Sequence, residues 1–173
     1  GRVPVPPGEG ALADAAEAAA PGAVLTLAAG RYSVDRTILV DAPLTVRGPA
    51  EGEAEISFSR PALFQLQRGG SLKLSRVAVT GRDAPDEVGN AVIRVAAGSN
   101  AANFEIIVED SRVSDLIVNR GFDVIALGKG SMADRVLLKG VTVDNVSGAV
   151  VSAAAQTDDR GTYNGETIRI EGG

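Results

Sequence analysis

The densest group of side chains that could do chemistry lies late in the 173-residue chain, between Gln156 and Glu166. Asp158, Asp159 and Glu166 supply carboxylate oxygens, the ligands that a hard cation such as calcium prefers. Tyr163 lies among them and could stack on a sugar ring or, once deprotonated, act as a base. The spacing matches no established calcium-binding loop. A structured turn, in which Asp and Asn side chains bond the backbone, is therefore the alternative interpretation.

Basic residues are spread more loosely over the second half of the chain. Guanidinium binds carboxylate bidentately, so a strip of such groups could hold a carboxylated sugar. The candidates for this strip are Arg94, Arg112, Arg120, Lys129 and Arg135. Together with Tyr163, we expect Arg94, Arg120 and Lys129 to contact substrate. Because Asp115, Asp123 and Asp134 are interleaved with these cations, a solvated face of mixed charge is the alternative.

Other catalytic motifs are missing from the sequence. The chain has no His, which removes the commonest general base and metal ligand, and it has no Cys. The segment Gly128–Ser131 invites comparison with a phosphate-binding loop, but the full spacing of that motif is absent. No serine-nucleophile motif or recognisable carboxylate pair is present. The sequence therefore disfavours nucleophilic and zinc chemistry.

The charge balance narrows the classes of partner. Seventeen basic and 22 acidic residues give a net charge of −5, which disfavours non-specific binding to nucleic acid. No apolar run approaches the roughly 18 residues that a membrane-spanning helix needs. We therefore expect neither a nucleic acid nor a membrane as partner.

These side chains must be positioned by a repeated unit, because four stretches superpose at a step of 29 residues. One set of superposed apolar residues is Phe64, Ile93, Phe122 and Val151; the other is Leu66, Val95, Val124 and Ala153. The residues between the two sets are mostly polar, namely Gln65, Arg94, Asp123 and Ser152. Short parallel strands stacked in register, with two side chains inward and one outward, produce this pattern. The predicted fold is all-β, a right-handed parallel β-helix.

A second ladder follows the first. It contains Leu74, Val108, Leu138 and Ile170, and Val79, Val113 and Val143 follow its first three members five residues later. Together the ladders predict about five coils. The connection between them lengthens along the chain, and its longest insertion runs from Ala155 to Glu166. Insertions in a solenoid often form its binding side, although drift in a permissive turn is the alternative.

The two ends of the repeat differ. We expect residues 1–10, which are rich in Pro and Gly, to be an extended linker. A short alanine-rich helix should then cover the first coil, with Leu12, Ala15, Ala16 and Ala19 on its apolar face. The domain is predicted to span 11–173. Its last strand pattern stops without a polar cap, so we expect a fragment of a longer protein.

Several segments resemble known families. Residues 11–48, an alanine-rich helix followed by Pro21–Tyr32 and Leu44–Gly48, look like the first coil of many right-handed parallel β-helix proteins. Three later segments resemble the C-terminal β-helix of polysaccharide lyase family 6, which comprises alginate lyases and chondroitinase B relatives. These segments are Gly128–Val136, Val141–Gly148 and Asp158–Glu166.

This resemblance implies that catalysis belongs to a separate N-terminal β-helix, with a lysine base, an arginine acid and calcium at the uronate carboxylate. Those motifs match no positions here, so the resemblance implies no catalytic residue and no cofactor for this chain. It implies instead an accessory domain of a periplasmic or secreted enzyme. The expected partners are the N-terminal catalytic domain, an anionic polysaccharide such as alginate and, for a homodimer, a second copy.

Two other functions stay open. One is a self-sufficient lyase that cleaves uronate polymers by β-elimination, with Tyr163 or Lys129 as base and Arg120 as charge neutraliser. The other is a purely structural or assembly module.

Overall fold

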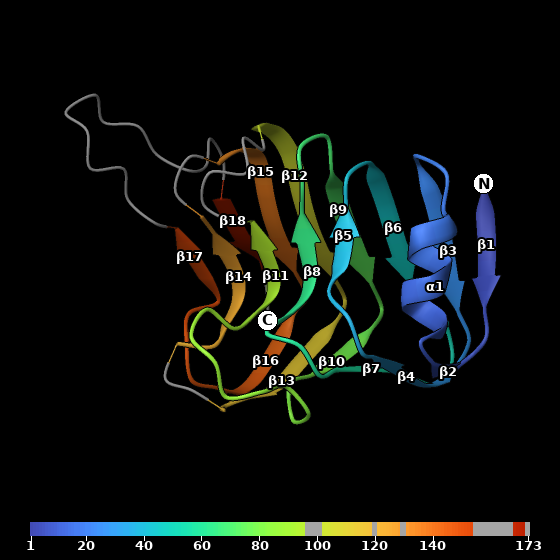
Figure 1. Cartoon of the computed structure of the whole chain (residues 1–173), viewed down its shortest axis with the longest axis horizontal. Coiled ribbons are helices and arrows are strands. Elements are labelled where there is room, and N and C mark those ends of the chain that lie inside the picture. The colour runs from blue at the N-terminus through green and yellow to red at the C-terminus, as the bar shows by residue number, and fades with distance from the viewer. Residues whose placement is uncertain (96–101, 119–120, 129–130, 154–167, 172–173) are drawn as a thin grey trace.

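The computed structural model describes residues 1–95, 102–118, 121–128, 131–153 and 168–171. In this part of the chain, strands wind repeatedly through three parallel sheets, named A, B and C here (Figure 1). Sheet A contains β1 (Arg2–Val5), β3 (Ala23–Leu27), β6 (Pro43–Arg47), β9 (Ser71–Ser75), β12 (Ala102–Glu109), β15 (Met132–Lys139) and β18 (Ile168–Glu171).

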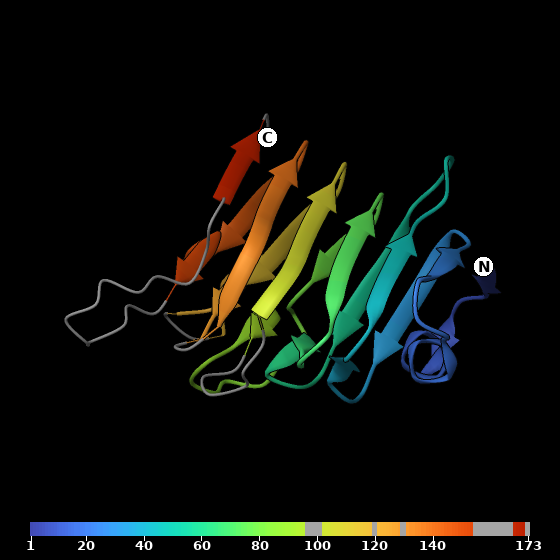
Figure 2. The same cartoon turned by 90° about the horizontal axis from the view of Figure 1, so that it is seen from above.

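The other two sheets follow the same order along the stack. Sheet B contains β2 (Gly8–Glu9), β4 (Gly30–Val34), β7 (Ala54–Phe58), β10 (Ala78–Thr80), β13 (Arg112–Leu116) and β16 (Thr142–Val146). Sheet C contains β5 (Ile38–Val40), β8 (Ala62–Leu66), β11 (Ala91–Val95), β14 (Asp123–Leu127) and β17 (Val151–Ala153). The described strands thus make five complete coils, from β3–β5 to β15–β17, and the predicted parallel β-helix is confirmed. Figure 2 shows the strands of sheet A side by side along the stack.

Most of the predicted register is confirmed. In sheet A, Leu74, Val108, Leu138 and Ile170 are direct neighbours in successive strands. In sheet B, Val79, Val113 and Val143 are likewise aligned. In β12, Phe104, Ile106 and Val108 are buried and the residues between them are not, because successive side chains of a strand point to opposite faces and only one face meets the core.

In sheet C the predicted step of 29 residues holds only between β8 and β11. Phe64 lies opposite Ile93 as predicted, but Ile93 then lies opposite Ile125, which in turn faces Val151. Phe122 and Val124 are therefore three residues out of the predicted register, and Ala126 rather than Asp123 neighbours Arg94.

Packing in the interior accounts for this shift. The buried ring of Phe122 packs edge-on against Phe58, at 6.0 Å between ring centroids. Phe58 belongs to an earlier coil, and Gly81 lies beside the ring of Phe122. A Cβ atom on Gly81 would come within 3.2 Å of the Phe122 ring and 2.5 Å of Leu116. The missing side chain leaves room for Phe122 before β14 begins.

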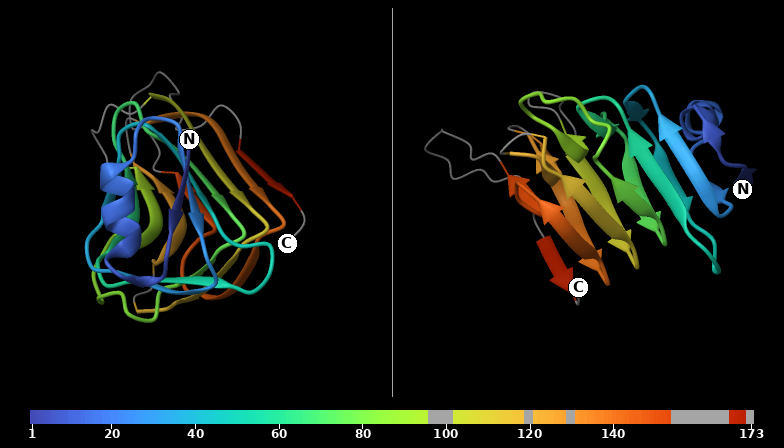
Figure 3. Two further views of the ribbon diagram at one scale, coloured as in Figure 1. Left: turned by 90° about the vertical axis from the view of Figure 1, so that its right-hand side faces the viewer. Right: turned by 90° about the horizontal axis from the view of Figure 1, so that it is seen from below.

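A helix covers the N-terminal end of the stack, as predicted. The helix α1 spans Ala11–Ala18 and lies across the first coil in the end-on view of Figure 3. Leu12 and Ala13 are fully buried, and Ala15, Ala16 and Ala19 pack partly buried against the core.

Residues 1–10 are not the expected linker. β1 pairs with β3 and β2 pairs with β4, so this segment begins the β-helix. The prediction rested on its prolines, but Pro4 lies in the outermost strand of sheet A, where a strand does not need all of its N–H groups. Val5 is buried, and its carbonyl accepts a 2.6 Å hydrogen bond from the Tyr32 hydroxyl.

In three successive coils, the turn from sheet A to sheet B contains one residue with left-handed backbone conformation, and these residues stack on one another. They are Arg76, Asp110 and Gly140, with φ of 54°, 48° and 64°. Each donates its amide to the strand end of the next coil, at Glu109, Lys139 and Glu171 respectively. The corresponding connection after β6 is longer and spans residues 48–53.

No helix in the described part of the chain is long and apolar enough to cross a membrane.

Candidate functional site

The outer face of sheet C carries the one predicted substrate-binding residue that the structure describes. Arg94 lies on β11 between two inward-pointing residues, Ile93 and Val95, so its side chain points outward and is half-buried. Its Nε and Nη2 atoms donate to Oε1 of Gln65, the neighbour on β8, at 3.0 and 2.8 Å. The in-register partner therefore orients the guanidinium along the sheet.

The charge of Arg94 is not compensated by a carboxylate within the described residues. In the same part of the chain, Arg36, Arg82, Arg112, Arg135 and Arg169 each form an ion pair with Asp or Glu. Arg94 is bound instead by the neutral amide of Gln65. A guanidinium held in place by a neutral group keeps its attraction for an external carboxylate.

The predicted basic strip does not form as one surface. Arg94 lies on sheet C, Arg112 on sheet B and Arg135 on sheet A. Each coil turns at three corners, one between each pair of sheets, so residues that are close in sequence face different directions. Arg112 is also bound by Glu53, and Arg135 lies 3.5 Å from a carboxylate oxygen of Glu105.

The remaining predicted site residues lie outside the described residues. They are Arg120, Lys129 and Tyr163, expected to contact substrate, and Asp158, Asp159 and Glu166, expected to bind a metal. The long insertion Ala155–Glu166 belongs to the same undescribed part. Within the described ranges, no group of three or more acidic side chains is arranged to hold a metal ion.

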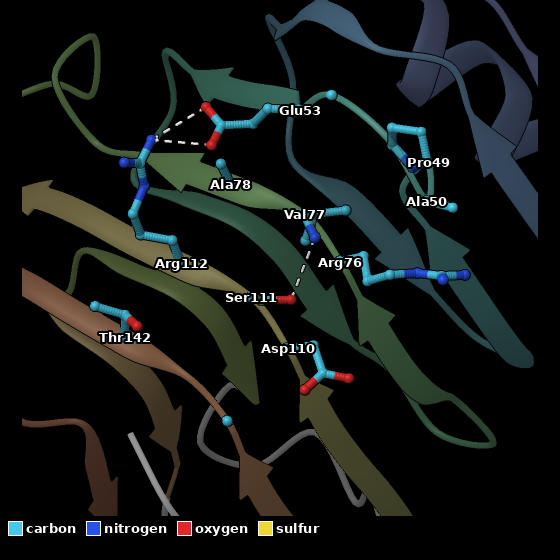
Figure 4. A pocket seen from close by; sticks show the side chains of 12 residues that line it. Pro49, Ala50, Glu53, Arg76, Val77, Ala78, Asp110, Ser111, Arg112 and Thr142 are labelled. Atoms are coloured by element: carbon cyan, nitrogen blue, oxygen red, sulfur yellow. Dashed lines mark hydrogen bonds and ion pairs between the residues drawn. The ribbon is translucent and has the colours of Figure 1, made fainter.

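A groove of about 460 Å³ lies where sheet A turns into sheet B, and we call it the edge groove (Figure 4). The connection 48–53 forms its wall, and the turns around Arg76, Asp110 and Gly140 line the rest. The groove exists because the connection from β6 to β7 has six residues, whereas the equivalent connections after β9, β12 and β15 have two each. Sequence reasoning missed this groove, although the extra residues after β6 were the available signal.

One ion pair spans the edge groove. Arg112 Nη2 lies 3.1 and 3.2 Å from the two carboxylate oxygens of Glu53. Glu53 lies two coils before Arg112 along the stack. Ala78 occupies the intervening coil, and its short side chain lets Arg112 reach across (Figure 4). The hydroxyl of Ser111 accepts from the amide of Val77 at 3.3 Å and donates to the carbonyl of Glu109 at 2.7 Å.

A second hollow of about 240 Å³ adjoins the edge groove and shares Ala78 and Arg112 with it. Here the Arg82 guanidinium pairs with the carboxylate of Glu55. The hydrogen bond to Glu55 raises the pKa of Arg82 above its ordinary value, and the negative charge of Glu55 adds to this effect. Outward hydroxyls of Thr80 and Ser114 line the same hollow.

Comparison with solved structures finds close counterparts of this chain. The structure of the PL6 family alginate lyase AlyGC superposes with a TM-score of 0.92 at 31% sequence identity, and so does a variant of it in which an arginine is replaced by alanine. Each match covers 96% of this chain and 23% of the other, so the chain spans about a quarter of the length of these relatives. No family model and no curated protein matches the chain.

Proposed function

This chain belongs to polysaccharide lyase family 6 and has an alginate lyase-like fold, and from that premise we propose that it is an accessory domain. In this proposal it forms the C-terminal β-helix of a longer, secreted or periplasmic lyase and holds an anionic polysaccharide such as alginate without cleaving it. The N-terminal catalytic domain of the same protein would be its partner. Fold does not determine function, so the proposal depends on the surface chemistry described above.

The observation that carries the proposal is the uncompensated guanidinium of Arg94. It is fixed by Gln65 on the outer face of sheet C and pairs with no carboxylate among the described residues. A uronate carboxylate could accept a charge-assisted hydrogen bond from it. β-Elimination would need a base at the ring proton in addition to such a neutralising group. The side chain bound to Arg94 is an amide, which is not a base.

The experiment is a titration of the chain with a mannuronate hexamer, in which binding is monitored through the NMR chemical shifts of the backbone amides. Replacing Arg94 with Ala should weaken binding about 10-fold or more, because a hydrogen bond to a charged group is lost. Arg94→Lys should restore part of it. The matched control is Arg31→Ala, which removes an exposed guanidinium from the outer face of sheet B. Equal weakening by both substitutions would show only general charge attraction and would contradict the proposal.

The same sample distinguishes the accessory role from a self-sufficient lyase. We expect no unsaturated uronate after prolonged incubation with alginate, as measured by ultraviolet absorbance of the product. If product does form, the proposal is wrong, and loss of activity in Lys129→Ala or Tyr163→Phe would identify the base.

A further inference from the structure

We propose that the edge groove is a second carbohydrate site, which binds a neutral oligosaccharide through vicinal hydroxyl groups. It lies at the junction of sheets A and B, whereas Arg94 lies on sheet C. The inference does not depend on the proposed function.

The shape of the surface suits a short extended ligand. The groove volume of about 460 Å³ is within the range of small-molecule sites. The second hollow continues it along sheet B through Ala78 and Arg112. The connection 48–53 closes one end as a wall, so a chain of sugars would lie across successive coils and abut this wall.

The polar groups are those that recognise a diol. The carboxylates of Glu53 and Asp110 are acceptors, the Arg112 guanidinium is a planar set of donors, and the exposed Thr142 hydroxyl can do either. Each carboxylate has two oxygens at a fixed separation, so it can accept from two neighbouring hydroxyls of one sugar ring. The ion pair with Glu53 holds Arg112 over Ala78 before any ligand arrives, which reduces the entropy lost on binding.

The charge of the surface selects against uronates. The acidic residues lining the two hollows are Glu53, Glu55, Asp110, Asp115 and Asp144. The basic ones among the described residues are Arg76, Arg82 and Arg112, and two of these already pair with Glu55 and Glu53. A carboxylated sugar that extends over both hollows would meet more carboxylates than guanidinium groups and hence net repulsion, whereas a neutral one would not.

The solenoid supplies substitutions that preserve the backbone. Asp110 has φ of 48°, and the equivalent residue in the next coil is Gly140 with φ of 64°. Asp110→Gly therefore removes the carboxylate at a position where glycine is already used. Arg112→Ala copies Ala78, its neighbour in the preceding coil. Thr142→Ala alters an exposed side chain. Arg31→Ala lies in the same outward row but outside the groove and is the control.

The test is a titration of the chain with mannohexaose and, separately, with cellohexaose. Binding is monitored through the NMR chemical shifts of the backbone amides of Ser111 and Thr142. We expect saturation with at least one neutral hexamer at a Kd of about 1 mM or tighter. Asp110→Gly and Arg112→Ala should each raise that Kd about 10-fold, while Arg31→Ala and Arg94→Ala leave it unchanged.

Three results would overturn the inference. One is that neither neutral hexamer reaches saturation at about 10 mM. Another is an unchanged Kd in Asp110→Gly, Arg112→Ala and Thr142→Ala, each shown to be folded by circular dichroism. The third is tighter binding of a mannuronate hexamer at the same amides. None of them affects the Arg94 experiment, so the two proposals can fail separately.

Discussion

At the residue scale, the buried hydroxyl of Tyr32 ties the first strand to the stack. It donates to the carbonyl of Val5 at 2.6 Å and lies 3.0 Å from that of Ala28. Burial raises the pKa of Tyr32 above its ordinary value of about 10, although the hydrogen bond to Ala28 acts in the opposite direction. The neutral phenol is therefore favoured in the folded chain. Its contribution to stability is complete below pH 10 and is lost as pH rises above that value.

Replacing Tyr32 with Phe keeps the ring and removes the hydroxyl. We expect a loss of about 1 to 2 kcal/mol in the free energy of unfolding, because the buried carbonyl of Val5 loses its donor. The decline in stability above pH 10 should become shallower, since Phe has no proton to lose. Urea unfolding between pH 7 and 11 measures both effects. Thr26→Val, which removes a longer and more exposed bond to Val3, is the control. An unchanged alkaline decline would contradict this role of Tyr32.

At the element scale, α1 is held on the end of the stack by apolar packing and by one arginine. Arg36, between β4 and β5, pairs with Asp14 and Glu17 of the helix and with its neighbour Asp35. The hydrogen bond from Arg36 lowers the pKa of Glu17 and is the largest cause of that shift. The resulting stabilisation is present above the ordinary pKa of Glu17, about 4.5, and is lost as pH falls below it.

Arg36→Ala should therefore loosen α1 without unfolding the coils. We expect faster amide hydrogen exchange in 11–18 at neutral pH and unchanged exchange in β7 and β8. In the unaltered chain, acidification below about pH 4 should produce part of the same effect. Arg47→Ala, on the outer face of sheet A, is the control. Equal acceleration in β7 would mean that the helix and the coils open together.

At the scale of the whole molecule, the apolar interior continues to the last described coil. Val143, Val146, Val150 and Val151 are only partly buried there. Ile170 is 61% exposed, although its in-register neighbour Leu138 is buried. An exposed apolar layer beside unpaired strand edges favours association. This layer is the observation behind the alternative that the chain serves assembly, for instance as a homodimer.

Sedimentation measures that alternative directly. Assembly through this layer predicts a mass that rises with protein concentration and returns to that of one chain in Ile170→Glu. The control is Val3→Glu, because Val3 is also exposed but lies near the other end of the stack. This substitution should leave association unchanged. A single-chain mass at every concentration would contradict assembly through this end.

The sequence by itself determined the β-helix, its helical cap and the ladders of sheets A and B, because these depend on a local alternation of apolar and polar residues. Tertiary structure decided the rest. The register of β14 depends on how Phe122 packs against Phe58 beside Gly81, and no spacing along the chain encodes that contact. The separation of Arg94, Arg112 and Arg135 onto three sheets depends on the turns of each coil. The edge groove likewise arises only when connections of unequal length are stacked, because a groove is a difference in height between neighbouring coils.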